Sequence, residues 1–266
     1  MASPFNIRRQ TGFTTIAVTC FVLLYMPIIL LVVYSFNSGN SIAIWEGFSW
    51  RWYQSAWQNE QVQEATVRSL IIALWASGIS TSVAVLAALA TTRTRKFKGQ
   101  SAVFAMINQP LMVPEIVTAV ALLIFFAMIK VATGYTGLAY LIIAHSAFCI
   151  PFAYLPIRAR LQGMDLSLEQ AAADLYATPF QVFRRITLPQ LWPGILAGAM
   201  LAFVISLDDV VITEFVKSAG QDTLPTYMLG QLRRVVTPEI NAISTVLLGI
   251  SVTFVIAFTV LSKIKN

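Results

Sequence analysis

Six apolar stretches separated by polar segments organise this 266-residue chain. Each stretch is close to or above the roughly 20 residues that an α-helix needs to cross a bilayer. The pattern predicts an all-α membrane protein in which residues 1–266 form a single transmembrane domain. The predicted spans are residues 13–36, 69–90, 102–129, 138–157, 195–216 and 240–261.

The composition supports a multi-pass membrane protein rather than a soluble domain. Hydrophobic residues make up 57% of the chain and charged residues 11%, whereas soluble domains carry about 25% charged residues. The net charge of +6 could indicate nucleic acid, but twelve of the 18 Lys and Arg residues fall on the side of the membrane that both termini share. This asymmetry predicts cytoplasmic termini and explains the charge without a nucleic-acid partner.

The polar segment 164–194, between the fourth and fifth spans, breaks the apolar pattern. Asp165 or Ser167 can cap a first short helix. The three alanines at 171–173 favour helix and leave one helix face without bulky side chains, so that another surface can approach closely.

A second helix is predicted within the same segment. Thr178 and Pro179 form an N-cap and N1 pair that opens a helix over residues 180–187. Pro189 and Pro193 are expected to end regular helix before the fifth span. The segment is therefore predicted to be a helix–turn–helix elbow on the cytoplasmic surface.

This elbow resembles the coupling loop of ABC importer permeases. The loop motif is Glu-Ala-Ala, three residues, Gly, nine residues, Ile, one residue, Leu-Pro, and the spacing here matches it throughout. Gln170 stands at the Glu position beside Glu169, and Tyr176 stands at the Gly position, where a Gly often supplies a positive φ. The resemblance implies that an ATPase docks on Glu169, Gln170, Ala171, Ala172, Asp174, Tyr176, Phe183, Ile186, Leu188 and Pro189.

The sequence contains no phosphate-binding glycine loop, nucleophile elbow or Cys/His cluster with metal spacing. The chain is therefore predicted to be a non-catalytic subunit without a cofactor or metal of its own. ATP and Mg²⁺ are expected to act in a separate ATPase subunit.

Four acidic residues fall in or near the apolar spans: Asp208, Asp209, Glu115 and Glu214. A carboxylate inside a bilayer is costly and is retained where it faces protein or a water-filled path. The four acids could form a path for a cationic solute, or they could bond neighbouring helices. His145, by contrast, is predicted to be a packed residue with a satisfied hydrogen bond.

Residues 217–239 form the loop before the last span and carry Arg233 and Arg234. This loop is a candidate docking surface for a solute-binding protein. A solvated connector is the alternative.

Beyond the elbow, the segments 34–38, 51–53, 145–149, 206–209 and 238–242 resemble the second permease subunit of spermidine/putrescine ABC importers, in its putrescine-type branch. The resemblance implies the type I permease fold in a bacterial inner membrane. It also implies a heterodimer with a related permease, two copies of a cytosolic ATPase and a periplasmic binding protein. The alternatives are an importer of another organic cation, an amino-acid derivative or an iron chelate, and a proton-driven secondary carrier.

Overall fold

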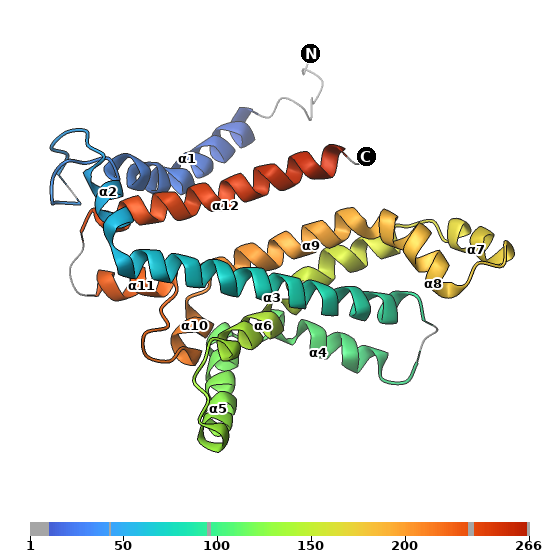
Figure 1. Cartoon of the computed structure of the whole chain (residues 1–266). Helices are drawn as coiled ribbons and strands as arrows, with labels where there is room; N and C mark the ends of the chain where they lie inside the picture. Colours follow the sequence, from blue (N-terminus) through green and yellow to red (C-terminus); the bar gives the residue numbers. More distant parts are fainter. Residues whose placement is uncertain (1–10, 43, 95–96, 234–236, 265–266) are drawn as a thin grey trace, which may run out of the picture. The chain divides into compact units, whose positions relative to one another are not determined.

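The computed structural model describes residues 11–42, 44–94, 97–233 and 237–264, and these residues are almost entirely helical (Figure 1). Their one β-bridge pairs Asn37 with Phe48, and no sheet forms among them. The helices are α1 (Thr11–Tyr34), α2 (Arg51–Gln58), α3 (Glu60–Thr92), α4 (Gln100–Met112), α5 (Glu115–Thr133), α6 (Ala139–Gln162), α7 (Ser167–Asp174), α8 (Pro179–Val182), the π-helical turn η1 (Phe183–Thr187), α9 (Leu188–Asp208), α10 (Val211–Val216), α11 (Leu224–Leu232) and α12 (Glu239–Ile264).

Six helical segments of the described chain are long and apolar enough to cross a membrane, as the sequence predicts. They are Gly12–Tyr34, Glu60–Thr92, Glu115–Thr133, Ala139–Gln162, Pro179–Asp208 and Glu239–Ala257. The prediction of an all-α fold with six membrane helices is confirmed.

Three of the predicted spans differ from the structure by more than five residues at one end or at both. The second begins at Glu60 rather than at residue 69. The third is interrupted at Val113 and Pro114, so α5 alone forms the membrane segment and α4 is a separate helix. The fifth does not begin at 195, because helical backbone continues from Pro179 through η1 into α9. The prediction that Pro189 and Pro193 end regular helix is therefore wrong.

The described residues pack into two compact units. The first comprises residues up to Glu60 together with Gln231–Ile250, and the second comprises Gln61–Gly230 and the residues from Ser251 onward. In the first unit the Asn37 amide donates to the carbonyl oxygens of Ser41 (2.9 Å) and Ile44 (2.7 Å), which fixes the loop after α1.

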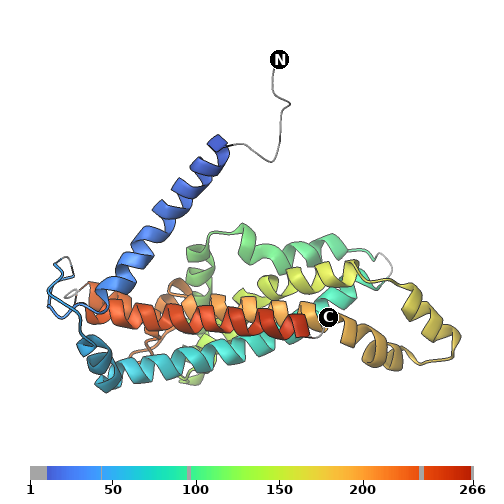
Figure 2. The same ribbon diagram turned by 90° about the horizontal axis from the view of Figure 1, so that it is seen from above.

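The second unit is built on the close crossing of α6 and α9. A Cβ added at Gly198 would lie 2.7 Å from the Ala153 carbonyl oxygen, so only glycine allows this approach. Gly194, four residues earlier, faces Arg160 in the same way. Small residues at four-residue spacing let membrane helices pack closely where no hydrophobic effect drives association. Figures 1 and 2 both show α7 and α8 projecting beyond the ends of α6 and α9, so this crossing is the base of the elbow.

Candidate functional site

The first helix of the elbow ends in a Schellman motif centred on Tyr176. The Tyr176 N–H donates to the Ala173 carbonyl (2.9 Å) and the Ala177 N–H donates to the Ala172 carbonyl (3.1 Å). Tyr176 has a φ of 61°, in the left-handed region that a Schellman motif requires and that usually favours glycine. The tyrosine therefore retains the turn geometry that the motif's glycine would provide, and its side chain is 96% exposed.

The start of this helix is fixed by an acidic side chain just before it. The Asp165 carboxylate accepts hydrogen bonds from the Ser167 Oγ (2.7 Å) and the Ser167 N–H (2.9 Å). These two bonds stabilise the ionised carboxylate and lower the pKa of Asp165 below its ordinary value.

The second half of the elbow begins as the sequence predicts. The Gln181 N–H donates to the Thr178 Oγ1 (3.4 Å) and the Thr178 N–H donates to the Gln181 Oε1 (2.9 Å), which makes a capping box with Pro179 at the first position. A π-turn follows, in which the Leu188 N–H donates to the Phe183 carbonyl. The widened turn, followed at once by Pro189 in the first turn of α9, accommodates a proline that has no N–H to donate.

The predicted docking residues of the elbow divide into an outward and an inward set. Gln170, Ala171, Asp174, Tyr176 and Pro189 are exposed, whereas Glu169, Ala172, Phe183, Ile186 and Leu188 are half-buried. Two large apolar side chains that the sequence analysis did not single out are also exposed: Leu175 (81%) and Phe180 (69%). Exposed apolar residues clustered at one tip are typical of a protein interface.

Glu169 points into the protein and joins three elements. Its Oε1 lies 3.2 Å from the Arg93 Nη2, just after α3, and accepts a hydrogen bond from the Thr187 Oγ1 (2.9 Å) on η1. The sequence offered no signal for the Arg93 partner, which is 76 residues away along the chain.

A second candidate region lies where the fifth span breaks, at Asp208 and Asp209. The Asp209 carboxylate is buried and accepts hydrogen bonds from the backbone N–H groups of Ile212 (3.3 Å) and Thr213 (2.9 Å) and from the Thr213 Oγ1 (2.9 Å). It thus satisfies the first N–H groups of α10. The Asp208 side chain, by contrast, is exposed.

His145 completes this buried network. Its Nε2 lies 2.9 Å from the Thr213 Oγ1 and its Nδ1 lies 2.8 Å from the Ser206 Oγ. Because the Thr213 hydroxyl donates to Asp209, it accepts from the histidine Nε2–H, which leaves Nδ1 to accept from Ser206. Both ring nitrogens are satisfied and His145 is 1% exposed, so the prediction of a packed, hydrogen-bonded histidine is confirmed.

Of the remaining predicted site residues, Glu115 lies beside Asp209, whereas no hydrogen bond within the described residues joins the Glu214 or Arg233 side chain to this network. Glu115 is the first residue of α5, directly after the break at Pro114, and is half-buried. Glu214 accepts a hydrogen bond from the Lys217 Nζ (2.6 Å). Arg233 is exposed just after α11, and Arg234 lies outside the described residues.

Lys217 joins two acids in the segment after α10. Its Nζ donates to the Asp222 Oδ1 (2.7 Å) as well as to Glu214. Burial lowers the pKa of Lys217, but the hydrogen bonds to the two carboxylates outweigh it and raise the pKa above its ordinary value of 10.5. The segment 217–239 is thus not a simple loop: it contains this ion-paired turn and α11.

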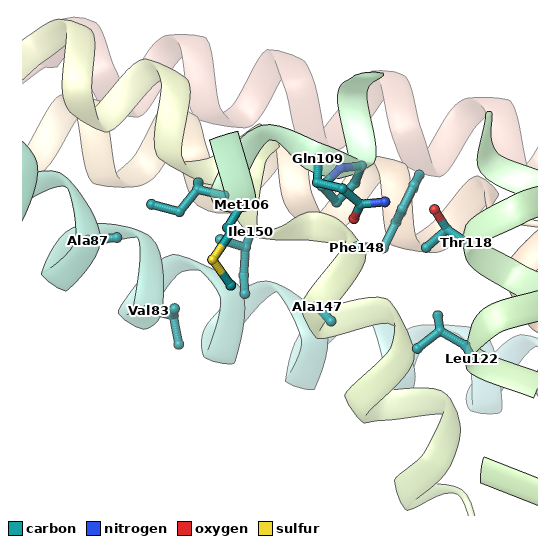
Figure 3. A pocket seen from close by; sticks show the side chains of 11 residues that line it. Val83, Ala87, Met106, Gln109, Thr118, Leu122, Ala147, Phe148 and Ile150 are labelled. Carbon is teal, nitrogen blue, oxygen red and sulfur yellow. The ribbon is translucent and has the colours of Figure 1, made fainter. Parts of the chain in front are cut away.

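A cavity of about 370 Å³ lies in the second unit, lined by α3, α4, α5 and α6 (Figure 3). Its described lining is apolar except for Gln109 and Thr118. The described residues also contain no group of three or more His, Cys, Asp or Glu side chains that could hold a metal. The cavity therefore has no charged side chain in its described lining, and the described residues offer no metal site.

Residues 80–264 match the model of the family described as the binding-protein-dependent transport system inner membrane component. The chain belongs to this family. The match covers the elbow, α9 and the break at Asp209, so the geometry described above is that of a transport-system membrane component.

Two relatives within this family extend over most of the chain. The putrescine transport system permease protein PotI of Escherichia coli (strain K12) is 39% identical over 86% of this chain and 83% of its own length. The spermidine/putrescine transport system permease protein PotC of Haemophilus influenzae is 37% identical over 91% of this chain and 93% of its own length.

The fold of this chain is also seen in solved structures. A bacterial ABC transporter that imports the acidic polysaccharide alginate superposes with a TM-score of 0.73, at 18% identity, over 95% of this chain and 94% of that one. The MetNI methionine ABC transporter, in inward-facing conformations, superposes with a TM-score of 0.64, at 17% identity, over 79% of this chain and all of that one. The chain therefore has the type I ABC importer permease fold and is a multi-pass inner membrane protein.

Proposed function

We propose that this chain is one of two related permease subunits in an ATP-driven importer that takes up putrescine or spermidine. Two copies of a cytosolic ATPase bind ATP and Mg²⁺ and drive transport, and a periplasmic binding protein delivers the solute. Both termini and the elbow lie in the cytoplasm, and Arg233, which is exposed, contacts the binding protein together with Arg234.

The observation that carries this proposal is the exposed tip of the elbow, whose two helices are held by local hydrogen bonds. The capping box and the Schellman motif fix its two helices, while Ala171, Leu175, Tyr176 and Phe180 remain exposed. Such a preformed, partly apolar tip suits insertion into a cleft of another protein, because little ordering remains to be done on docking. The names of the two relatives above supply the solute class.

The two neighbouring aspartates take different roles in this proposal. Asp209 holds the break between α9 and α10 through its hydrogen bonds and is structural. Asp208 is exposed, so it is the acid available to line the solute path and to attract a cationic amine. We assign Glu115 and Glu214 to the same path as part of this proposal, and Glu214 is paired to Lys217.

The test is uptake of labelled putrescine and spermidine into liposomes that hold the full complex, with the binding protein outside and ATP inside. Asp208→Asn keeps the shape of the side chain and removes its charge, and it should lower uptake at least about 10-fold, since a hydrogen bond to a charged group contributes about 1.5–3 kcal/mol. The complex should still assemble. Asp209→Asn should instead lower stability, because an NH₂ group replaces one carboxylate oxygen and takes an acceptor away from the buried donors of Ile212 and Thr213.

Two results would contradict parts of the proposal. Uptake that is unchanged in Asp208→Asn removes this acid from the path. If the complex hydrolyses ATP in response to the binding protein but takes up no polyamine, the proposed solute class is refuted, whereas the proposed importer architecture is not.

A further inference from the structure

The contact between Arg93 and Glu169 joins the elbow to the end of α3. The Arg93 Nη2 and the Glu169 Oε1 are 3.2 Å apart, and both side chains are 19% exposed. Partial burial protects such a pair from screening by salt. Glu169 also accepts from Thr187, so one carboxylate holds α7, η1 and the residue after α3 together.

This contact leaves the guanidinium with unused donors. The Arg93 Nε and Nη2 are buried and have no hydrogen-bond partner among the described residues, because the ion pair lacks the direction of a hydrogen bond. A guanidinium and a carboxylate bind most strongly in a parallel, two-bond arrangement. The present contact is a single ion-pair contact without a hydrogen bond, so it rests on the opposite charges of Arg93 and Glu169.

Hydrogen bonds also hold the N-terminal part of α3. The Arg68 Nη1 donates to the Asp222 carbonyl (2.7 Å), and the Leu224 N–H donates to the Ser69 Oγ (2.8 Å). Asp222 is the residue whose carboxylate binds Lys217. The segment 217–224 is therefore bonded to the third turn of α3, and the elbow is bonded to the residue after the last turn of α3.

The distance between these two attachments follows from helix geometry. Residues 69 to 93 span about 36 Å at 1.5 Å per residue. Figure 1 shows α7 and α8 near one end of α3 and α10 near the other. Midway, the Ser77 Oγ donates to the Ala199 carbonyl (2.6 Å), which keeps α3 against α9.

We propose that Arg93 is a positioning residue that makes α3 move together with the elbow. When the ATPase displaces the elbow, Glu169 pulls on Arg93, and α3 carries the displacement to the segment 217–224 at its far end. This inference rests on the proposed function, since it requires an ATPase at the elbow. It assigns Glu169 to a contact within the chain rather than to the docking face.

The experiment uses the full complex in liposomes and compares Arg93→Ala, Glu169→Ala and the double variant with wild type. The first measurement is the number of solute molecules taken up per ATP hydrolysed. Each single variant should lower this ratio at least about 5-fold, the lower end of ordinary coupling between sites. The double variant should be no worse than the worse single one, because both remove the same contact.

Two further variants separate coupling from folding. Arg93→Lys keeps the positive charge beside Glu169 and should retain most of the uptake per ATP. This variant keeps the proposal testable even if Arg93→Ala fails to fold. Lys98→Ala removes an exposed positive charge five residues further along the chain, whose side chain makes no hydrogen bond or ion pair within the described residues, and it should leave the ratio unchanged. Additive losses in the double variant, or an unchanged ratio in Arg93→Ala, overturn the proposal.

The second measurement does not depend on the solute. In the wild-type complex, ATP should change the hydrogen exchange of the Leu224 amide, and this change should disappear in Arg93→Ala but persist in Lys98→Ala. A change that persists in Arg93→Ala overturns the link through α3. If the link is seen but no polyamine is taken up, the solute assignment fails and the mechanical link stands.

Discussion

Tyr176 offers the sharpest test of how the elbow is built. Its φ of 61° places a residue with a Cβ in the left-handed region, which costs roughly 1–2 kcal/mol relative to glycine. Its side chain is 96% exposed, so its removal takes away no packing within this chain. Tyr176→Gly should therefore relieve the strain, while glycine's greater freedom in the unfolded chain opposes the gain by about 0.5–1 kcal/mol.

The net expectation is that the elbow becomes more stable by about 0.5–1 kcal/mol. The assay is hydrogen exchange of the Ala177 amide, which bonds the Ala172 carbonyl across the turn. Its protection factor should rise roughly two- to five-fold in the permease pair without ATPase. Tyr176→Ala is the matched control: it removes the same exposed ring but keeps a Cβ, so its protection should stay near that of wild type.

Equal protection in the Gly and Ala variants would refute the reasoning, because the strain would then not reside in the left-handed backbone. Lower protection in the Gly variant would show that the tyrosine ring stabilises the turn. The same two variants, measured with the ATPase present, separate turn geometry from any contact that the ring makes with the partner.

Two further predictions concern the helix crossing and the ion-paired turn. Gly198→Ala should destabilise the permease by about 1–3 kcal/mol, because the added Cβ would meet the Ala153 backbone. Gly78→Ala is the control: a Cβ there has nothing within 4 Å, so this change should be neutral or slightly stabilising. Denaturant titration of the purified protein compares the two variants, and equal effects contradict the close crossing. Because the pKa of Lys217 is raised in the folded protein, its charge stabilises the fold fully below pH 10.5, and this stabilisation is lost as the pH rises through the pKa of the folded state. The difference in stability between wild type and Lys217→Met should therefore vanish in strong alkali. A difference that grows in strong alkali contradicts the assignment.

The sequence by itself determined the features that depend on local pattern. Apolar runs long enough to span a bilayer predicted six membrane helices, and the described part of the chain contains six such segments. The spacing of the elbow motif and the Thr178–Pro179 pair predicted the position of the elbow and one of its caps. These signals are local, because hydrophobic length and capping depend on residues within a few positions of one another.

The roles of individual polar residues were decided by tertiary structure. Asp208 and Asp209 are chemically identical neighbours, yet only Asp209 is buried, because α9 ends between them and the N-terminus of α10 and His145 supply its partners. Glu169 turns inward because Arg93, distant in sequence, lies against it, while the adjacent Gln170 stays exposed. Partners that come from other helices leave no periodic trace in the chain, so only the packing of those helices distinguishes a structural acid from an accessible one.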